Sequence, residues 1–217
     1  EKLSGPAMAE DAIGEIDAGM SAGPLGVAVD APSARVAAGL GVIPRIVRDG
    51  AEIYRGKLKP EEATARLEKL YRPYHQALAA LVDETHARFG MAVVVDCHSM
   101  PSSLGAPDIV LGDRYGASAA PALSQLAQSA FAREGLSVAR NAPYAGGHTT
   151  TLHGRVHRGC HALQIEVNRG LYLDEDRIVK KERFETLKLK LTASLTRITR
   201  IDPALLRPAS ELPHAAE

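Results

Sequence analysis

Two side chains capable of metal or proton chemistry follow a short apolar run. The run 92–95 leads directly into Asp96 and His98. Such a β-branched run is typical of a buried strand, of the kind found in parallel sheets. Strand side chains alternate between faces, so Asp96 and His98 are predicted to point the same way. Because ligands of open α/β sheets bind beyond the carboxyl ends of the strands, we expect a site for metal or proton chemistry there.

A third candidate, Glu166, lies in the alternating segment His161–Val167. Leu163, Ile165 and Val167 would occupy one face of a strand, and Gln164, Glu166 and Asn168 the other. One interpretation is a half-exposed edge strand with a solvated polar face. The other is that Glu166 points into a site near Asp96 and His98, as a general base on water or a metal ligand.

A Gly- and Thr-rich loop, Ala142–Gly159, precedes that strand. Its paired glycines, Gly146 and Gly147, would allow the backbone to approach a ligand closely, unless this is a flexible surface loop. Arg155 could grip a substrate carboxylate with both guanidinium nitrogens, although any single arginine is more often a solvated surface residue.

Other histidines and cysteines carry weaker signals. His153, His157 and His161 have helical spacing, but Gly154 and Gly159 interrupt it, which disfavours a helical three-histidine metal site. Cys97 should face away from its neighbours Asp96 and His98, as a small core residue.

The elements that must position these residues alternate between strands and helices. We expect a long helix from Pro60 to Gly90, kinked at Pro73, with its apolar residues in one stripe. Further helices are expected at about Pro121–Arg133 and Asp176–Thr199. This order predicts an α/β fold with three αβα layers and a mostly parallel, mixed sheet.

Composition narrows the partners. The chain has 217 residues, with 26 Lys and Arg against 26 Asp and Glu, so it gives no reason to expect a nucleic acid or a membrane as partner. No apolar stretch approaches the roughly 20 residues of a membrane span. With only two cysteines, both read as free thiols, we expect a cytoplasmic protein. We expect a single domain over residues 1–217, with an irregular segment at 1–32 and a tail at 203–217.

Several ordered blocks resemble the N-formylglutamate amidohydrolase family. They cover most of the chain from about Ser33 to Glu175 and together are far more specific than any one motif. The blocks are 38–45, 50–56, 71–75, Asp96–Ser102, Pro107–Asp113, Asn141–Gly147, Gly154–Arg155 and His161–Glu166.

The resemblance implies a metal-dependent hydrolase with a fold similar to zinc carboxypeptidases. Family members hydrolyse N-formyl-L-glutamate to formate and L-glutamate, late in one route of histidine breakdown. The resemblance implies a divalent metal ion, with zinc the first candidate, and a small-molecule N-acyl amino acid as substrate. It leaves the oligomeric state, including a homo-oligomer, open.

The same resemblance suggests roles for individual residues. His98 looks like a metal ligand, Asp96 like its catalytic neighbour and Glu166 like the carboxylate that activates water. Substrate-binding groups are expected at Arg155, Asn141, Gly146 and Gly147.

This sequence departs from the family pattern at two places. Family members usually carry an N-terminal strand that ends in Pro-His-Ser-Gly, whose histidine is expected to bind metal, and this chain shows no such segment. Thr151 stands where we expect an arginine after the paired glycines. These departures motivate an alternative, a catalytically silent or truncated member with an incomplete metal site. A related carboxypeptidase or a deacylase for another acyl group is a further alternative.

Overall fold

The computed structural model describes residues 43–47, 50–56 and 58–207, and the segment 1–32 lies outside them. The chain divides into two compact units, residues 1–78 and 79–217, with the division inside one helix. The expectation of a single domain over residues 1–217 stays a prediction.

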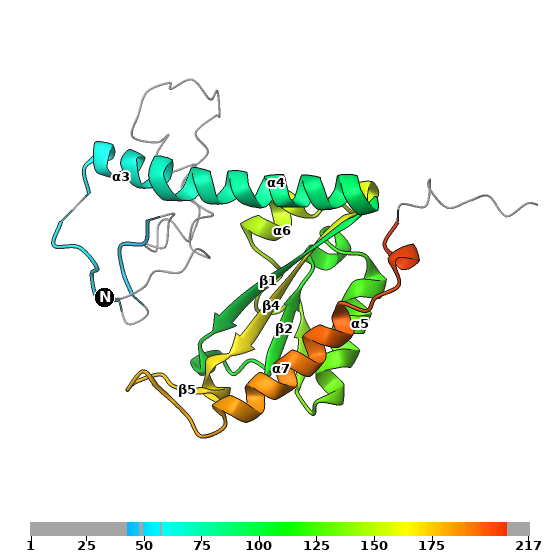
Figure 1. Cartoon of the computed structure of the whole chain (residues 1–217). Helices are drawn as coiled ribbons and strands as arrows, with labels where there is room; N and C mark the ends of the chain where they lie inside the picture. Colours follow the sequence, from blue (N-terminus) through cyan, green and yellow to red (C-terminus); the bar gives the residue numbers. More distant parts are fainter. Residues whose placement is uncertain (1–42, 48–49, 57, 208–217) are drawn as a thin grey trace, which may run out of the picture. The chain divides into compact units, whose positions relative to one another are not determined.

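Helices and strands alternate along the described chain, which confirms the predicted α/β class (Figure 1). The helices are α3 (Pro60–Arg66), α4 (Arg72–Phe89), α5 (Pro121–Arg133), α6 (His148–His153) and α7 (Phe184–Ile198), and the strands are β1 (Ala92–Met100), β2 (Ile109–Gly112), β3 (Val138–Arg140), β4 (Cys160–Asn168), β5 (Leu173–Asp174) and β6 (Val179–Lys180).

A four-stranded mixed sheet forms the centre of the second unit. Its strand order is β1-β4-β2-β3, with β1 parallel to β4, β2 antiparallel to β4, and β3 parallel to β2. The strand predicted from the run 92–95 therefore exists and pairs in parallel. This strand is longer than expected, because it continues past Asp96 to Met100. Among the described strands, β1 pairs only with β4 and so lies at an edge of the sheet. Its middle residues are partly exposed, so the expectation of a fully buried strand is wrong.

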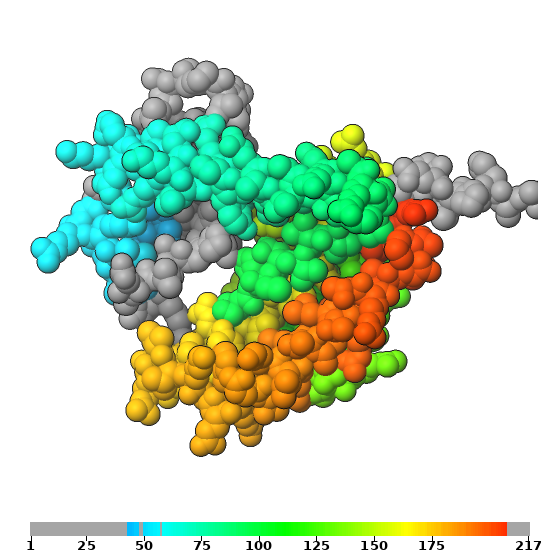
Figure 2. Space-filling model, in the orientation of Figure 1, coloured from blue at the N-terminus to red at the C-terminus, as the bar shows by residue number. Residues whose placement is uncertain are grey.

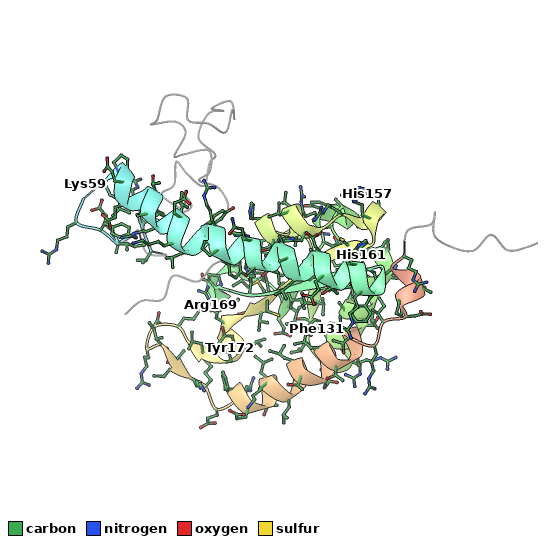
Figure 3. All side chains as sticks on the ribbon, turned by 45° about the horizontal axis from the view of Figure 1, so that its top comes forward. Lys59, Phe131, His157, His161, Arg169 and Tyr172 are labelled. Atoms are coloured by element: carbon green, nitrogen blue, oxygen red, sulfur yellow. The ribbon has the colours of Figure 1, made fainter. Side chains whose placement is uncertain are left out.

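One face of this sheet carries the apolar core. Leu163 and Ile165 of β4 and Leu111 of β2 pack there with residues of α5 and α7. Phe131 of α5, labelled in Figure 3, is fully buried in this cluster. Figure 2 shows α7, in orange, on the surface of the same unit. The burial of one helical stripe and of alternate strand positions is what joins these elements.

The opposite face of the sheet is polar and is covered by α6, which packs against β4 and β1. The loop predicted between Ala142 and Gly159 thus contains a short helix. Thr149, Thr150 and His153 are its buried residues. Helices therefore cover both faces of the sheet, with α6 on one face and α5 and α7 on the other (Figure 1).

The described part of the first unit is dominated by the predicted helix that starts at Pro60. A π-helical turn, Leu67–Tyr71, joins α3 to α4 immediately before Pro73. A π turn re-forms the hydrogen bonding where proline supplies no N–H, so the helix continues past Pro73. The predicted apolar stripe is wrong for Leu70, Tyr74 and Leu81, which are 69%, 47% and 60% exposed.

One further prediction needs correction. The last helix starts at Phe184 and not near Asp176, because the two-residue strands β5 and β6 form a hairpin before it. The C-terminal tail begins with an ordered 3-10 turn at Pro203–Leu205, and Leu206 is buried. No helix within the described residues is long and apolar enough to cross a membrane.

Candidate active site

His98 lies between two carboxylates on the polar face of the sheet. Its Nε2 is 3.0 Å from Oδ1 of Asp96, which is hydrogen-bond distance. Its Nδ1 is 3.6 Å from Oε1 of Glu166. The three residues that were expected to converge therefore do so, in the order Asp96–His98–Glu166.

Strand register brings the three together. His98 of β1 is the register partner of Glu166 in β4, and Asp96 is the partner of Gln164. Because paired positions of parallel strands share a face, all four side chains point to the side that α6 covers. The interpretation of β4 as a solvated edge strand is wrong, since β4 lies between β1 and β2, and Glu166 is only 5% exposed.

The environment of Glu166 suits a proton acceptor. Burial raises the pKa of the Glu166 carboxyl, although the charge on His98 and the hydrogen bond from Gln164 act in the opposite direction. Arg169, which follows β4 (Figure 3), also opposes the rise in this pKa. A carboxylate with a raised pKa is a better general base near neutral pH than an ordinary one.

Gln164 is a site residue to which the sequence reasoning gave no role. Its Oε1 accepts the backbone N–H of Gly147 at 2.8 Å, and its Nε2 donates to Oε1 of Glu166 at 2.9 Å. The available signal was its position two residues before Glu166, which places both on one strand face.

Gly146 and Gly147 bring the loop before α6 onto the sheet. A Cβ at Gly112 of β2 would lie 2.6 Å from the backbone N of Gly146, and one at Gly146 would lie 2.6 Å from Oγ1 of Thr150. Gly146 also has a φ of +118°. Only glycine fits both positions. The N–H of Gly147 is taken by Gln164, and its carbonyl accepts from Oγ1 of Thr150 at 2.6 Å.

Asn141 serves the fold around Asp113. Its Nδ2 donates to Oδ1 of Asp113 at 2.8 Å, and its Oδ1 accepts the N–H of Asp113 at 3.0 Å. Asp113 is fully buried and also bonds to Ser124 and Arg140. Burial acts to raise the pKa of Asp113, but these hydrogen bonds outweigh it, and the pKa is lowered. The expected role of Asn141 in substrate binding stays a prediction.

Arg155 lies towards the other end of β4. Its backbone N–H and carbonyl pair with Cys160, the first residue of the strand, which lies about 20 Å from Glu166 at the usual strand rise. Its side chain lines a cleft with Asp83, His86, Arg158 and Cys160. The backbone of Arg155 therefore lies far from the His98–Glu166 pair. The role of Arg155 in substrate binding stays a prediction.

The remaining candidates separate. His153, the last residue of α6, is buried, which lowers its pKa, and neither ring nitrogen has a hydrogen-bond partner among the described residues. His161 is on the other face of β4, so the three spaced histidines form no joint site. Cys97 faces away from Asp96 and His98 as expected, but it is exposed, so its assignment to the core is wrong.

His98 fits a metal ion as one ligand. Nε2 lies 3.0 Å from the Asp96 carboxylate, and Nδ1 lies on the side of Glu166. A carboxylate behind a ligating histidine is common in metal sites. Oε2 of Glu166 is buried without a hydrogen-bond partner among the described residues. However, the described residues contain no group of three or more potential ligands arranged to hold a metal. Catalytic zinc usually has three protein ligands, so the described part of the chain fits a metal only in part.

The fold and the site together define an α/β protein with a partly buried carboxylate–imidazole–carboxylate row near the carboxyl ends of two parallel strands. The family model described as N-formylglutamate amidohydrolase matches residues 19–173, more than half of the chain. The chain therefore belongs to the N-formylglutamate amidohydrolase family.

Individual relatives agree with this assignment. An N-formylglutamate deformylase of Pseudomonas aeruginosa is 35% identical over 144 residues, and one of Pseudomonas putida is 33% identical over 144 residues. Each match covers 62% of this chain and 54% of the relative, so the chain spans about half the length of these curated relatives. The crystal structure of an N-formylglutamate amidohydrolase from Ralstonia eutropha aligns with a TM-score of 0.73 and 34% identity, covering 82% of this chain and 67% of that one.

Proposed function

We propose that the protein hydrolyses the amide bond of N-formyl-L-glutamate to formate and L-glutamate, or that of a related N-acyl amino acid to the corresponding acid and amino acid. The observation that carries the proposal is the convergence of His98 and Glu166 at one register position of β1 and β4, with Asp96 on the other side of the imidazole. The family match and the names of the relatives support the choice of substrate.

Glu166 is the proposed general base. Its carboxylate takes a proton from the attacking water and then delivers it to the leaving amine. Its burial supports this role, because the raised pKa increases the proton affinity of the carboxylate. Delivery of the proton matters because an amine anion is a very poor leaving group.

Asp96 is the proposed orienting group of His98. The close contact between Nε2 and Oδ1 of Asp96, at 3.0 Å, helps to hold the imidazole ring in place. Loss of this carboxylate would remove one of the groups that hold the ring opposite Glu166.

We also propose that the enzyme uses a divalent metal ion, with zinc the first candidate, held through Nδ1 of His98. When bound, such an ion lowers the pKa of a bound water to about 7 and polarises a carbonyl oxygen. The predicted small-molecule substrate, the cytoplasmic location, the part in histidine breakdown and any homo-oligomer stay predictions.

Removal and return of the metal test this proposal. Formate release from N-formyl-L-glutamate should fall to background after treatment with a chelator and return when zinc is added back. Elemental analysis of the same preparations should show the metal lost and regained. Formate release that continues in metal-free protein would overturn the metal dependence, and no release in any state would overturn the hydrolase.

A catalytically silent family member is the alternative. The incomplete ligand set among the described residues and Thr151 in place of the expected arginine favour it. A silent protein should bind no zinc tightly and release no formate, whereas the proposed enzyme should hold one equivalent.

A further inference from the structure

The buried amide of Gln164 links the loop that contains Gly146 and Gly147, here called the glycine loop, to the proposed base Glu166. It is 4% exposed and lies between the Gly147 backbone and the Glu166 carboxylate. Both of its polar atoms are used, Oε1 as acceptor from Gly147 and Nε2 as donor to Glu166. A primary amide in this position has one orientation, because the Gly147 N–H can only be met by its oxygen.

This orientation makes the two oxygens of Glu166 unequal. Oε1 receives the Gln164 hydrogen bond and faces the His98 imidazole at 3.6 Å. Oε2 is also buried, and no described residue donates to it. A carboxylate held by one oxygen keeps the other oriented for a reacting water.

We propose that Gln164 is a positioning residue that anchors Oε1 of Glu166 and leaves Oε2 to accept the proton. The role in catalysis rests on the proposed hydrolase function, whereas the positioning itself does not. It follows that Gly147, Gln164 and Glu166 form one connected unit, in which loss of the acceptor at position 166 loosens the loop at position 147.

The loop is otherwise well supported, which makes this coupling measurable. The carbonyl of Gly147 accepts from Thr150 and Thr151, while its N–H has Gln164 as its acceptor. Exchange of the Gly147 amide hydrogen with solvent therefore reports on the Gln164 bond.

Amide hydrogen exchange measured by NMR is the first test. Gln164→Leu should speed exchange at Gly147 by about tenfold or more, as expected for loss of one hydrogen bond. Glu166→Ala should speed it too, because Gln164 loses the acceptor that orients it, although Gly147 donates its N–H to Gln164 and not to Glu166. Glu166→Gln should not, since its side-chain oxygen still accepts from Gln164. Rates are compared with the amide of Leu163 in the same spectrum, which reports general opening of β4.

Kinetics on N-formyl-L-glutamate are the second test. Gln164→Leu should lower kcat by about tenfold or more while KM changes by less than about twofold, as expected for a residue that acts on the chemical step. Ser194→Ala is the matched control, because it removes another buried hydrogen bond, to the Ala130 carbonyl, far from the site. It should lower stability and leave kcat and the Gly147 exchange rate unchanged.

The outcomes separate the two proposals. If the wild-type protein releases no formate, the hydrolase function fails, and the exchange comparison alone decides the role of Gln164. If Glu166→Ala leaves exchange at Gly147 unchanged, or if Gln164→Leu retains kcat in an active enzyme, the positioning role is overturned.

Discussion

His98 and Glu166 are register partners in the parallel pair β1–β4, and their side chains meet with Nδ1 3.6 Å from Oε1. The two residues come from segments far apart in the sequence, so their meeting depends on the pairing of the whole sheet. A shift of either strand by one residue would turn its side chain to the opposite face. The geometry of the site therefore depends directly on the β1–β4 register.

Asp113 should be a stability residue that has no part in catalysis. Asp113→Ala leaves Arg140, Ser124 and Asn141 without their shared buried acceptor, so we expect the free energy of unfolding to fall by about 3 kcal/mol at pH 7. Urea denaturation measures it, with the exposed Glu182→Ala as control. Because the pKa of Asp113 is lowered in the folded state, the wild-type contribution should persist at neutral pH and be lost only as pH falls below the usual value of 3.8. An equal loss in both variants would contradict this role.

His161 should make the protein less stable at mildly acid pH. Its Nδ1 accepts the N–H of Ala120 at 3.2 Å, so its Nε2 carries the proton that it donates to the carbonyl of Leu206 at 2.7 Å (its ring is labelled in Figure 3). Burial lowers the pKa of His161 below the ordinary histidine value of 6.5. The unfolded chain then binds more protons between the two values, so stability is greatest above pH 6.5 and falls as pH is lowered.

The measurement is urea denaturation between pH 8 and pH 5. His161→Gln should be less stable than the wild type at pH 8 but should lose less stability on acidification. An unchanged pH slope in this variant would show that His161 does not cause the effect.

Gly112 should be intolerant of any side chain. A Cβ there would lie 2.6 Å from the N of Gly146 and 2.8 Å from the carbonyl carbon of Ala145, both of them backbone atoms. Gly112→Ala should therefore cost about 2 kcal/mol of stability and displace the glycine loop. Thermal unfolding measures the loss, and Gly56→Ala, with nothing within 4 Å of its Cβ, is the control. Equal stability of the two variants would mean that the loop does not approach β2 this closely.

Local sequence patterns predicted the strands and helices that carry the site, but not the helix α6 that covers it. Alternation placed Asp96 with His98 and Glu166 with Gln164, because side-chain direction in a strand follows from position alone. Alternation is the same in a solvated edge strand and a covered central one, so it could not decide whether Glu166 is buried. The helix α6 covers this face of the sheet and so determines that Glu166 is buried. It has only six residues, three of them threonines, and its sequence shows no helical pattern of its own.

Tertiary contacts also explain the other failures. Cys97 alternates correctly to the face opposite His98, but its exposure depends on what covers that part of β1. Leu70 has the spacing of an apolar helical stripe, but the residues of such a stripe are buried only where another element packs on them. Arg155 is not one of these failures: its backbone pairs with Cys160 at the start of β4, and its expected role in substrate binding stays a prediction.

Thr151 should limit substrate affinity if the expected arginine binds substrate in the family. Thr151 is exposed on α6, so Thr151→Arg adds a cation without displacing a buried group. It should lower KM for N-formyl-L-glutamate by about tenfold, the gain of one charge-assisted contact. Thr192→Arg, on the exposed face of α7, is the matched control, and an equal KM in the two variants would contradict the assignment.

The central claim is that the carboxylate of Glu166, set opposite His98, drives amide hydrolysis, and formate release by Glu166→Gln tests it most directly. The amide keeps the shape and the Gln164 hydrogen bond but cannot take a proton, so kcat should fall by at least about a hundredfold. Glu182→Gln, an exposed change of the same kind, should keep wild-type turnover. Wild-type kcat in Glu166→Gln would contradict the account.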